Sequence, residues 1–187
     1  MVSFSIPSLP EDAVEKYKLA ISDHLTECAV IARDMIRGGI DNGHDIHGDE
    51  FEPIHDVTKV VREMRGRGGD KPLYDTGRLY NSITVEDATS ADGEAHVNIG
   101  VEYGQYQNEG FYVGSNFTVP KKDPSESWKE HKERGGKFFL VEGKYVEPRE
   151  FWGLPADFFE RSEYKDAYDR LDKKVQEILG DFPVETY

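Results

Sequence analysis

The sequence has one cysteine and no long apolar run, and each shortage excludes a class of protein. Cys28 has no second cysteine to pair with, so no intramolecular disulfide forms. Its neighbours Leu25 and Ile31 share its helical spacing, which indicates a packed helix position rather than a nucleophile. No stretch approaches the roughly 20 apolar residues of a membrane span, and the N-terminus lacks the pattern of a secretory signal. We therefore expect a soluble protein made in a cytoplasm, with no membrane partner.

Positive charge is also scarce. The chain carries 23 Lys and Arg against 37 Asp and Glu, a formal net charge of −14. This balance argues against a protein that clamps nucleic acid by neutralising phosphates, although an acidic wall can line a channel through which DNA passes without sticking. Hydrophobic residues make up only 37%, yet 12% of the residues are aromatic. Aromatic side chains are enriched at protein interfaces, so the composition fits an oligomer subunit; the alternative is that the rings fill the core, which would account for many of them.

Catalytic motifs are absent as well. The sequence contains no nucleophile elbow, no phosphate-binding loop and no dinucleotide fingerprint. His44, His47 and His55 lie in an Asp-rich stretch, 41–56, and an alternative interpretation is a metal-dependent enzyme that uses them. Their spacing matches neither an EF-hand nor a zinc helix, which favours a solvated loop. We expect no enzyme activity, no cofactor and no metal. A third interpretation, DNA contact through Arg65, Arg67 and a Lys-rich stretch, conflicts with the overall acidity.

The order of the expected elements predicts an α+β domain that spans residues 1–187. We expect an antiparallel sheet with a long N-terminal helix and a C-terminal helix packed on it. The expected elements are an arm (1–10), a helix from Glu11 to a stop at Gly38-Gly39, a short helix after Asp56, a helical turn (78–83), a hairpin (83–86 and 96–101), a short helix (103–110), strands (111–113, 117–119, 137–142 and 144–146), a projecting loop (120–136), a helix from Ala156 or Asp157 to Gly180, and an arm (181–187).

Four blocks in a fixed order resemble a known family. They are GDEFEPI at 48–54, PLYDTGRL at 72–79 with NSI at 81–83, VNIGVEYGQYQNEG at 97–110, and VEPREFWGL at 146–154. Together they are similar to the bacteriophage virion-morphogenesis or tail-completion family, which includes the G-type proteins of Mu-like phages. Gly104 stands where the family usually has Ala, and Gln107-Asn108 replace a common His-Gln pair. The similarity covers about 38–154.

The resemblance implies a non-enzymatic virion protein at the head–tail junction, or neck, of a tailed phage. Such proteins form a ring of identical subunits, often a hexamer, that joins the head connector or adaptor to the tail tube or tail terminator. The ring surrounds the DNA path without sequence-specific binding. The protein would assemble in the host cytoplasm and reside in the virion neck. A tail terminator or a head-side stopper at the same junction are alternatives.

Several side chains in these blocks are candidates for structural or interface roles. Arg78, beside the turn-forming Thr76, and Arg149 each lie in a turn, from which a guanidinium can reach carboxylates or carbonyl groups. An intramolecular bridge is favoured over a subunit contact for both arginines. The aromatic candidates for core or interface positions are Tyr103, Tyr106, Trp128, Phe151 and Trp152, of which we assign Tyr103 and Phe151 to the core.

Overall fold

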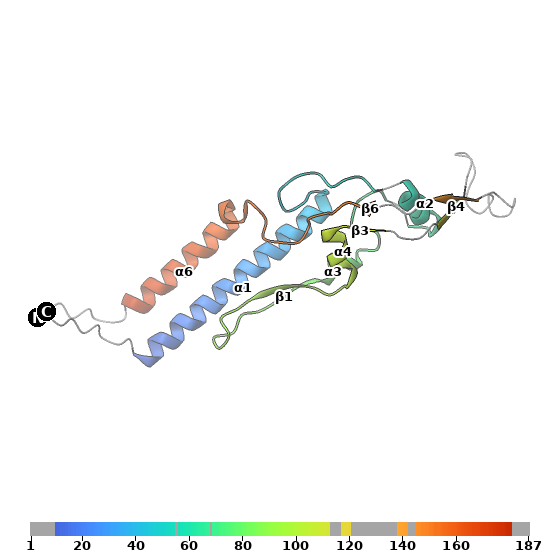
Figure 1. The fold of residues 1–187 in the computed structure, drawn as a ribbon. Coiled ribbons are helices and arrows are strands. Elements are labelled where there is room, and N and C mark those ends of the chain that lie inside the picture. The colour runs from blue at the N-terminus through green and yellow to red at the C-terminus, as the bar shows by residue number, and fades with distance from the viewer. Residues whose placement is uncertain are drawn as a thin grey trace, which may run out of the picture. The chain divides into compact units, whose positions relative to one another are not determined.

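The computed structural model describes residues 10–54, 56–67, 69–112, 117–120, 138–141 and 145–180 (Figure 1). Both expected arms, apart from Pro10, and the projecting loop beyond Pro120, with Trp128, lie outside the described residues. The chain divides into two compact units, the first made of 1–35, 83–98 and 154–187 and the second of 36–82 and 99–153. The single domain therefore stays a prediction, whereas the α+β class is confirmed.

In the first unit, two helices run antiparallel to each other. The N-terminal part of α1 (Glu11–Asn42) lies alongside α6 (Ser162–Gly180), as Figure 1 shows. Lys174 Nζ lies 2.9 Å from Asp23 Oδ2, and Arg170 pairs with Glu27 one turn further along α1. The buried positions of these helix segments are mainly small: Ala13, Ala20, Ser22, Ala29, Ala32 and Ala167. Small side chains allow close approach of the backbones.

The first unit also contains a hairpin, as the alternating sequence predicts. Strand β1 (Ile83–Glu86) pairs with β2 (His96–Ile99). The turn between them is stabilised by Asp92, whose carboxylate accepts the Thr89 N–H at 2.9 Å. This bond and its neighbours lower the pKa of the Asp92 carboxyl, because hydrogen bonds to the charged form favour it. The Ala88 N–H donates to Thr26 Oγ1 at 2.9 Å, which ties the hairpin to α1.

The prediction that α1 stops at Gly38-Gly39 is wrong. The helix continues through both glycines to its last residue, Asn42, and is followed by Gly43, whose φ is +79°. A glycine with positive φ commonly follows the last helical residue. Gly39 has a different role, because a Cβ there would lie 2.9 Å from the His44 carbonyl oxygen. The missing side chain thus lets the following loop fold back onto the helix.

The predicted start of the last helix, at Ala156 or Asp157, is also wrong. A 3₁₀ turn, η1 (Phe158–Glu160), comes first and buries Phe158. Arg161 is then extended, with φ −64° and ψ 143°. An α-helix needs ψ near −42°, so α6 can begin only after this residue, at Ser162.

The second unit contains three short helices and two short strand pairs. The helices are α2 (Asp56–Met64), α3 (Arg78–Ser82) and α4 (Tyr103–Glu109), which confirms the three short helical segments expected there. Strand β3 (Phe111–Tyr112) pairs antiparallel with β6 (Tyr145–Val146), and β4 (Phe117–Pro120) pairs antiparallel with β5 (Phe138–Val141). The described strands thus form three separate two-stranded ladders rather than the one sheet expected, since β3 and β4 take different partners.

Apolar side chains from distant parts of the sequence form the core of this second unit. The described hydrophobic residues at most 8% exposed there are Ile36, Ile40, Phe51, Ile54, Leu79, Val101 and Phe151. Phe51 and Ile54 anchor the loop after α1, as expected from its sequence. Leu79 is buried as the period of the helical turn predicts.

Candidate functional site

Parts of all four sequence blocks meet within the second unit, where hydrogen bonds to backbone groups join them. The Gly100 N–H donates to the Ser82 carbonyl oxygen at 3.0 Å, linking the second and third blocks. The Arg149 N–H donates to the Gln107 carbonyl oxygen at 2.9 Å, linking the third and fourth. Arg149 Nη2 donates to the Glu52 carbonyl oxygen at 3.3 Å, which brings in the first block. The blocks are thus one structural element assembled from four parts of the chain.

Two glycines permit the close packing of these blocks. A Cβ on Gly104 would lie 2.8 Å from Ile99 Cγ2 and 3.5 Å from Leu79 Cδ1. A Cβ on Gly110 would lie 2.9 Å from the Val146 carbonyl oxygen, and Gly110 has φ +79° and ψ 161°. This backbone conformation is almost confined to glycine. Gly110 therefore ends α4 and lets the fourth block approach it.

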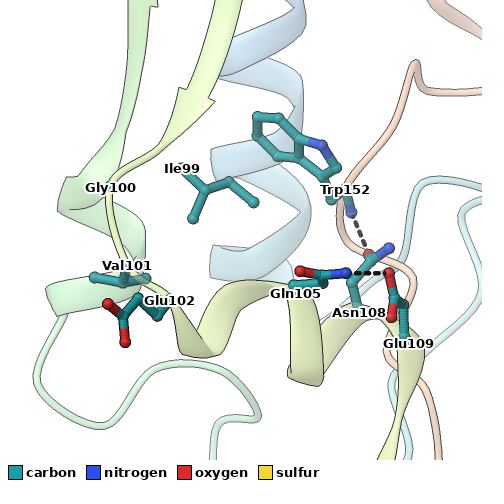
Figure 2. Close-up of a pocket in the computed structure, with 8 residues that line it drawn as sticks. All are labelled: Ile99, Gly100, Val101, Glu102, Gln105, Asn108, Glu109 and Trp152. Carbon is teal, nitrogen blue, oxygen red and sulfur yellow. Dashed lines mark hydrogen bonds between the residues drawn. The ribbon is translucent and has the colours of Figure 1, made fainter.

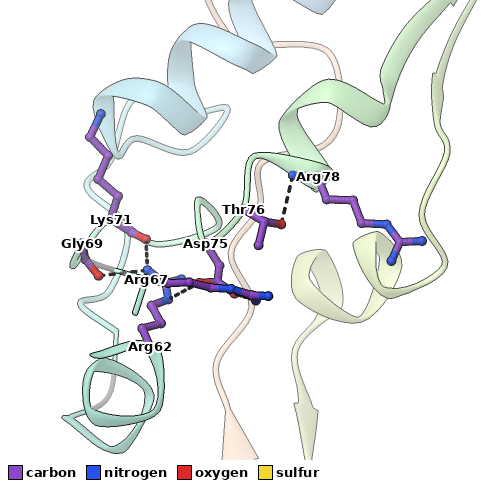
Figure 3. A network of polar contacts seen from close by, with 7 residues as sticks. All are labelled: Arg62, Arg67, Gly69, Lys71, Asp75, Thr76 and Arg78. Carbon is purple, nitrogen blue, oxygen red and sulfur yellow. Dashed lines mark hydrogen bonds and ion pairs between the residues drawn. The ribbon is translucent and has the colours of Figure 1, made fainter. Parts of the chain in front are cut away.

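A buried arginine organises the chain before the second block. Arg62, on α2, is 8% exposed, and its Nη1 donates to the Lys71 carbonyl oxygen at 2.8 Å and to the Gly69 carbonyl oxygen at 3.3 Å (Figure 3). Its Nε lies 3.6 Å from Asp75 Oδ1, while Arg67 Nη1 lies 3.2 Å from Asp75 Oδ2. Because one guanidinium donates to two loop carbonyl groups and forms an ion pair with a carboxylate, it holds Gly69, Lys71 and Asp75 against α2.

Arg78 lies beside this cluster but takes no part in it. The Thr76 hydroxyl oxygen accepts the Arg78 backbone N–H at 3.4 Å, so Thr76 acts as the turn residue expected. Figure 3 shows the Arg78 side chain extending away from Arg62 and Asp75. Its guanidinium is exposed and has no hydrogen-bond or ion-pair partner within the part of the chain that the structure describes. The favoured intramolecular bridge of Arg78 is therefore not found there.

Arg149, by contrast, is a structural anchor, as predicted. It bonds Gln107 through its backbone and Glu52 through its guanidinium. The pKa of Arg149 is lowered from its ordinary value, first by burial and then by the nearby charge of Arg62, while Glu52 partly offsets both effects. Both causes disfavour the charged form, so the arginine is held at some electrostatic cost by the packing around it.

The aromatic candidates separate into one core residue and several surface residues. Phe151 is 1% exposed, which confirms its core assignment. Tyr103 is 39% exposed, so its core assignment is wrong, and Tyr106 is 60% exposed. The buried position of α4 is Gly104, and a residue one step away on a helix points about 100° away from it. Trp152 is half-buried.

A pocket of about 640 Å³ lies beside α4 (Figure 2). Trp152 forms one wall, and its backbone N–H donates to Asn108 Oδ1 at 2.9 Å. Glu102 and Glu109 supply carboxylates, and Gln105 Nε2 donates to Glu109 Oε1 at 3.0 Å. Ile99, Gly100 and Val101 complete the lining. The pocket thus combines an aromatic wall, apolar contacts and two carboxylates, without a basic residue in its lining.

The histidines proposed for a metal site are placed separately. His44 forms a β-bridge with Glu50, and His47 Nε2 lies 3.1 Å from Glu150 Oε2. His55 lies outside the described residues. Among the residues that are described, no group of three or more His, Cys, Asp or Glu side chains is arranged to hold a metal ion.

Sequence reasoning missed Arg62 and the pocket. The sequence does offer a signal for Arg62, which is an arginine on a short helix before a glycine-rich loop. The carbonyl groups of such a loop need hydrogen-bond donors when they are buried, and a nearby arginine can supply them. The pocket had no such signal, since its lining combines 99–109 with Trp152 from a distant block.

Comparison with known proteins adds no relative: no family model, no curated protein and no solved structure matches the chain. None of the helices that the structure describes has the length and apolar character to cross a membrane.

Proposed function

We propose that this protein is a structural component of the neck of a tailed bacteriophage. In this role identical subunits form a ring that joins the head connector to the tail and surrounds the DNA path. The four blocks resemble the tail-completion family, so tail completion is the role we favour. The alternatives are a tail terminator or a head-side stopper at the same junction. The protein would reach this position in the host cytoplasm, during assembly of the virion.

The observation that carries this proposal is the convergence of the four blocks. Residues from 48 to 154 that resemble the family in sequence also bond to one another, at Ser82–Gly100, Gln107–Arg149 and Glu52–Arg149. Chance similarity in four short stretches gives no reason for the stretches to meet. The hydrogen bonds between the blocks support the interpretation that they form one structural unit inherited together, as expected if the chain shares the family's fold.

The acidic composition gives the ring a physical role. A formal charge of −14 per subunit repels the phosphate backbone. A ring with an acidic inner wall therefore guides DNA without retaining it, which suits a passage between head and tail.

The test is a cryo-electron microscopy map of the virion together with loss of the gene. We expect a ring of this chain between head and tail, and separate heads and tails when the chain is missing. Supplying the intact chain should restore joined particles. Finding the chain only in the capsid shell or the tail tip, or absent from the virion, would contradict the proposal.

A further inference from the structure

The last helix, α6, carries an apolar face that α1 covers only in part. Ala167 is 1% exposed, and Lys174, which lies on the same line of the helix, pairs with Asp23, so this line faces α1 (Figure 1). Tyr168 and Leu179 point about 100–120° away from Ala167 around the helix, and they are 54% and 49% exposed. One edge of the apolar face is therefore buried against α1, and the other edge is exposed.

The residues of the exposed edge form one connected surface, the α6 stripe: Phe159, Tyr164, Tyr168, Val175 and Leu179. The ring centroids of Phe159 and Tyr164 lie 5.1 Å apart, and those of Tyr164 and Tyr168 lie 6.5 Å apart. Val175 and Leu179 return to within about 20° of the line through Tyr168. The stripe therefore runs from η1 to the last turn of α6.

The stripe is large enough for a contact with another chain but small for a permanent one. Its three most exposed side chains, Phe159, Tyr168 and Leu179, are each about half exposed, which leaves about 300 Å² of apolar surface. Two such stripes supply about 600 Å², and at the usual apolar share of an interface this corresponds to about 1,000 Å² in total. That area is near the lower limit for a specific contact. We therefore expect a contact that forms as the concentration rises.

The charges beside the stripe favour α6 of a second copy as the partner. Lys165 and Asp172 are exposed and flank the stripe, about 60° and 40° from Tyr168. In two antiparallel copies of α6 whose two-fold axis passes beside Tyr168, Lys165 of each copy lies next to Asp172 of the other. The same register brings Leu179 of one copy to the η1 turn of the other, where Phe159 is exposed.

Neither flanking charge has an ion-pair partner within the part of the chain that the structure describes. Lys165 Nζ donates to the Glu160 carbonyl oxygen at 2.8 Å, and Asp172 Oδ2 accepts from Gln176 Nε2 at 2.7 Å. On the opposite edge of α6, by contrast, the basic residues pair with acids of α1. One edge of the helix is thus matched to its neighbour by charge, and the other edge carries unmatched charges of both signs.

We propose that two copies of this chain pair in antiparallel orientation through their α6 stripes. Tyr168 lies beside the two-fold axis in both copies, and the two contacts between Lys165 and Asp172 fix the register. A two-fold contact uses the same surface of both copies and closes on itself. The pair is therefore distinct from the contacts that close a ring. The inference concerns the free chain, goes beyond the proposed function and does not depend on it.

The test is a charge exchange in the full chain. Lys165→Asp and Asp172→Lys, each alone, bring like charges together at two places in the contact. Each should raise the dissociation constant of the pair at least about 10-fold. Sedimentation velocity over a range of concentrations measures the pairing, and circular dichroism checks that each variant is folded.

The double variant, Lys165→Asp with Asp172→Lys, is the decisive arm. It restores opposite charges between the copies and should pair like the unmodified chain. The two residues are seven positions apart, about 10 Å along the helix axis, which is too far for an ion pair within one chain. Recovery in the double variant therefore requires a second, antiparallel copy.

Matched controls separate the contact from general effects of charge. Lys173→Asp and Asp166→Lys make the same charge changes at exposed positions of α6 that point about 140–160° away from Tyr168. Both controls should pair like the unmodified chain. Tyr168→Ala removes one ring from each copy beside the axis and should raise the dissociation constant on the order of 100-fold.

A chain that stays monomeric as its concentration rises overturns the inference, and so does a double variant that pairs no better than the single variants. A monomer that begins to pair only after removal of residues 1–9 would overturn it and assign the stripe to the chain's own arm. A monomer that binds another virion protein through Tyr168 would overturn it and assign the stripe to that protein. The position of the chain in the virion decides the proposed function separately.

Discussion

Replacing Gly110 by alanine should strongly destabilise the second unit. Gly110 has φ +79° and ψ 161°, a conformation that costs other residues about 1–3 kcal/mol. A Cβ there would also lie 2.9 Å from the Val146 carbonyl oxygen and 3.0 Å from Pro148 Cδ. Forcing an extra carbon into a packed contact costs about 1–3 kcal/mol. The Tyr145 hydroxyl, 2.5 Å away, can move aside because it ends a side chain.

Together these terms predict a loss of about 2–6 kcal/mol, against a typical domain stability of about 5–15 kcal/mol. Urea unfolding followed by tryptophan fluorescence measures the change. Both tryptophans fall within the residue range of the second unit, so the signal reports on the part of the chain that is changed.

Gly43→Ala is the matched control. Gly43 has the same φ, +79°, and belongs to the same unit, but nothing lies within 4 Å of its Cβ position. Its substitution should cost only the backbone term, about 1–2 kcal/mol. If Gly110→Ala lowers the free energy of unfolding no more than Gly43→Ala does, the close approach of the fourth block to Gly110 is not a real constraint.

Two further predictions concern the buried Arg62 and the partly buried Cys28. Arg62→Met should cost about 1.5–3 kcal/mol, because the Lys71 carbonyl oxygen loses its charged donor. Urea unfolding measures the change, and a loss below about 0.5 kcal/mol, as for an ordinary surface substitution, would contradict this role of Arg62. Burial, and then the charge of Glu27, raise the pKa of the Cys28 thiol. The contribution of the protonated thiol to the stability of the folded chain is therefore complete below the unfolded-state pKa. It is lost as the pH rises through the folded-state pKa. Native Cys28 should therefore react more slowly with iodoacetamide at mildly alkaline pH than the urea-unfolded chain, and equal rates would refute the raised pKa.

Elements defined by local signals were predictable from the sequence. The helix after Asp56, the turn at 78–82 and the helix ending before Gly110 all depend on caps, glycines and apolar spacing within a few residues. The hairpin also depends on a local turn and alternation. These signals act over the same distance as the structures they specify.

Errors occurred where tertiary contacts override local preference. Gly39 looks like a helix stop, but its missing side chain accommodates the His44 carbonyl oxygen while the helix continues. Tyr103 and Gly104 are adjacent, and only packing against Leu79 and Ile99 shows which of them faces the core. The separate strand pairs are likewise set by which segments meet, which sequence spacing does not reveal.

The residues that hold the four blocks together could be predicted from the sequence, whereas the pocket beside α4 could not. Arg149 and Phe151 could be chosen because both lie in a turn that contains a proline. From such a turn an arginine can reach carbonyl groups, and an aromatic side chain can pack into the core. The pocket beside α4 joins Trp152 to residues 99–109, which lie more than forty positions earlier in the chain. Such a pocket exists only in the folded chain.

The interleaved order of the two units has a consequence for synthesis on the ribosome. The second unit needs residues up to Gly153, and the first needs α6, which follows it. Neither unit can close early in translation, since each needs segments from late in the chain. Trp152, one wall of the pocket, emerges near the end of the second unit. The nascent chain therefore lacks the pocket beside α4 until nearly all residues of the second unit have been made.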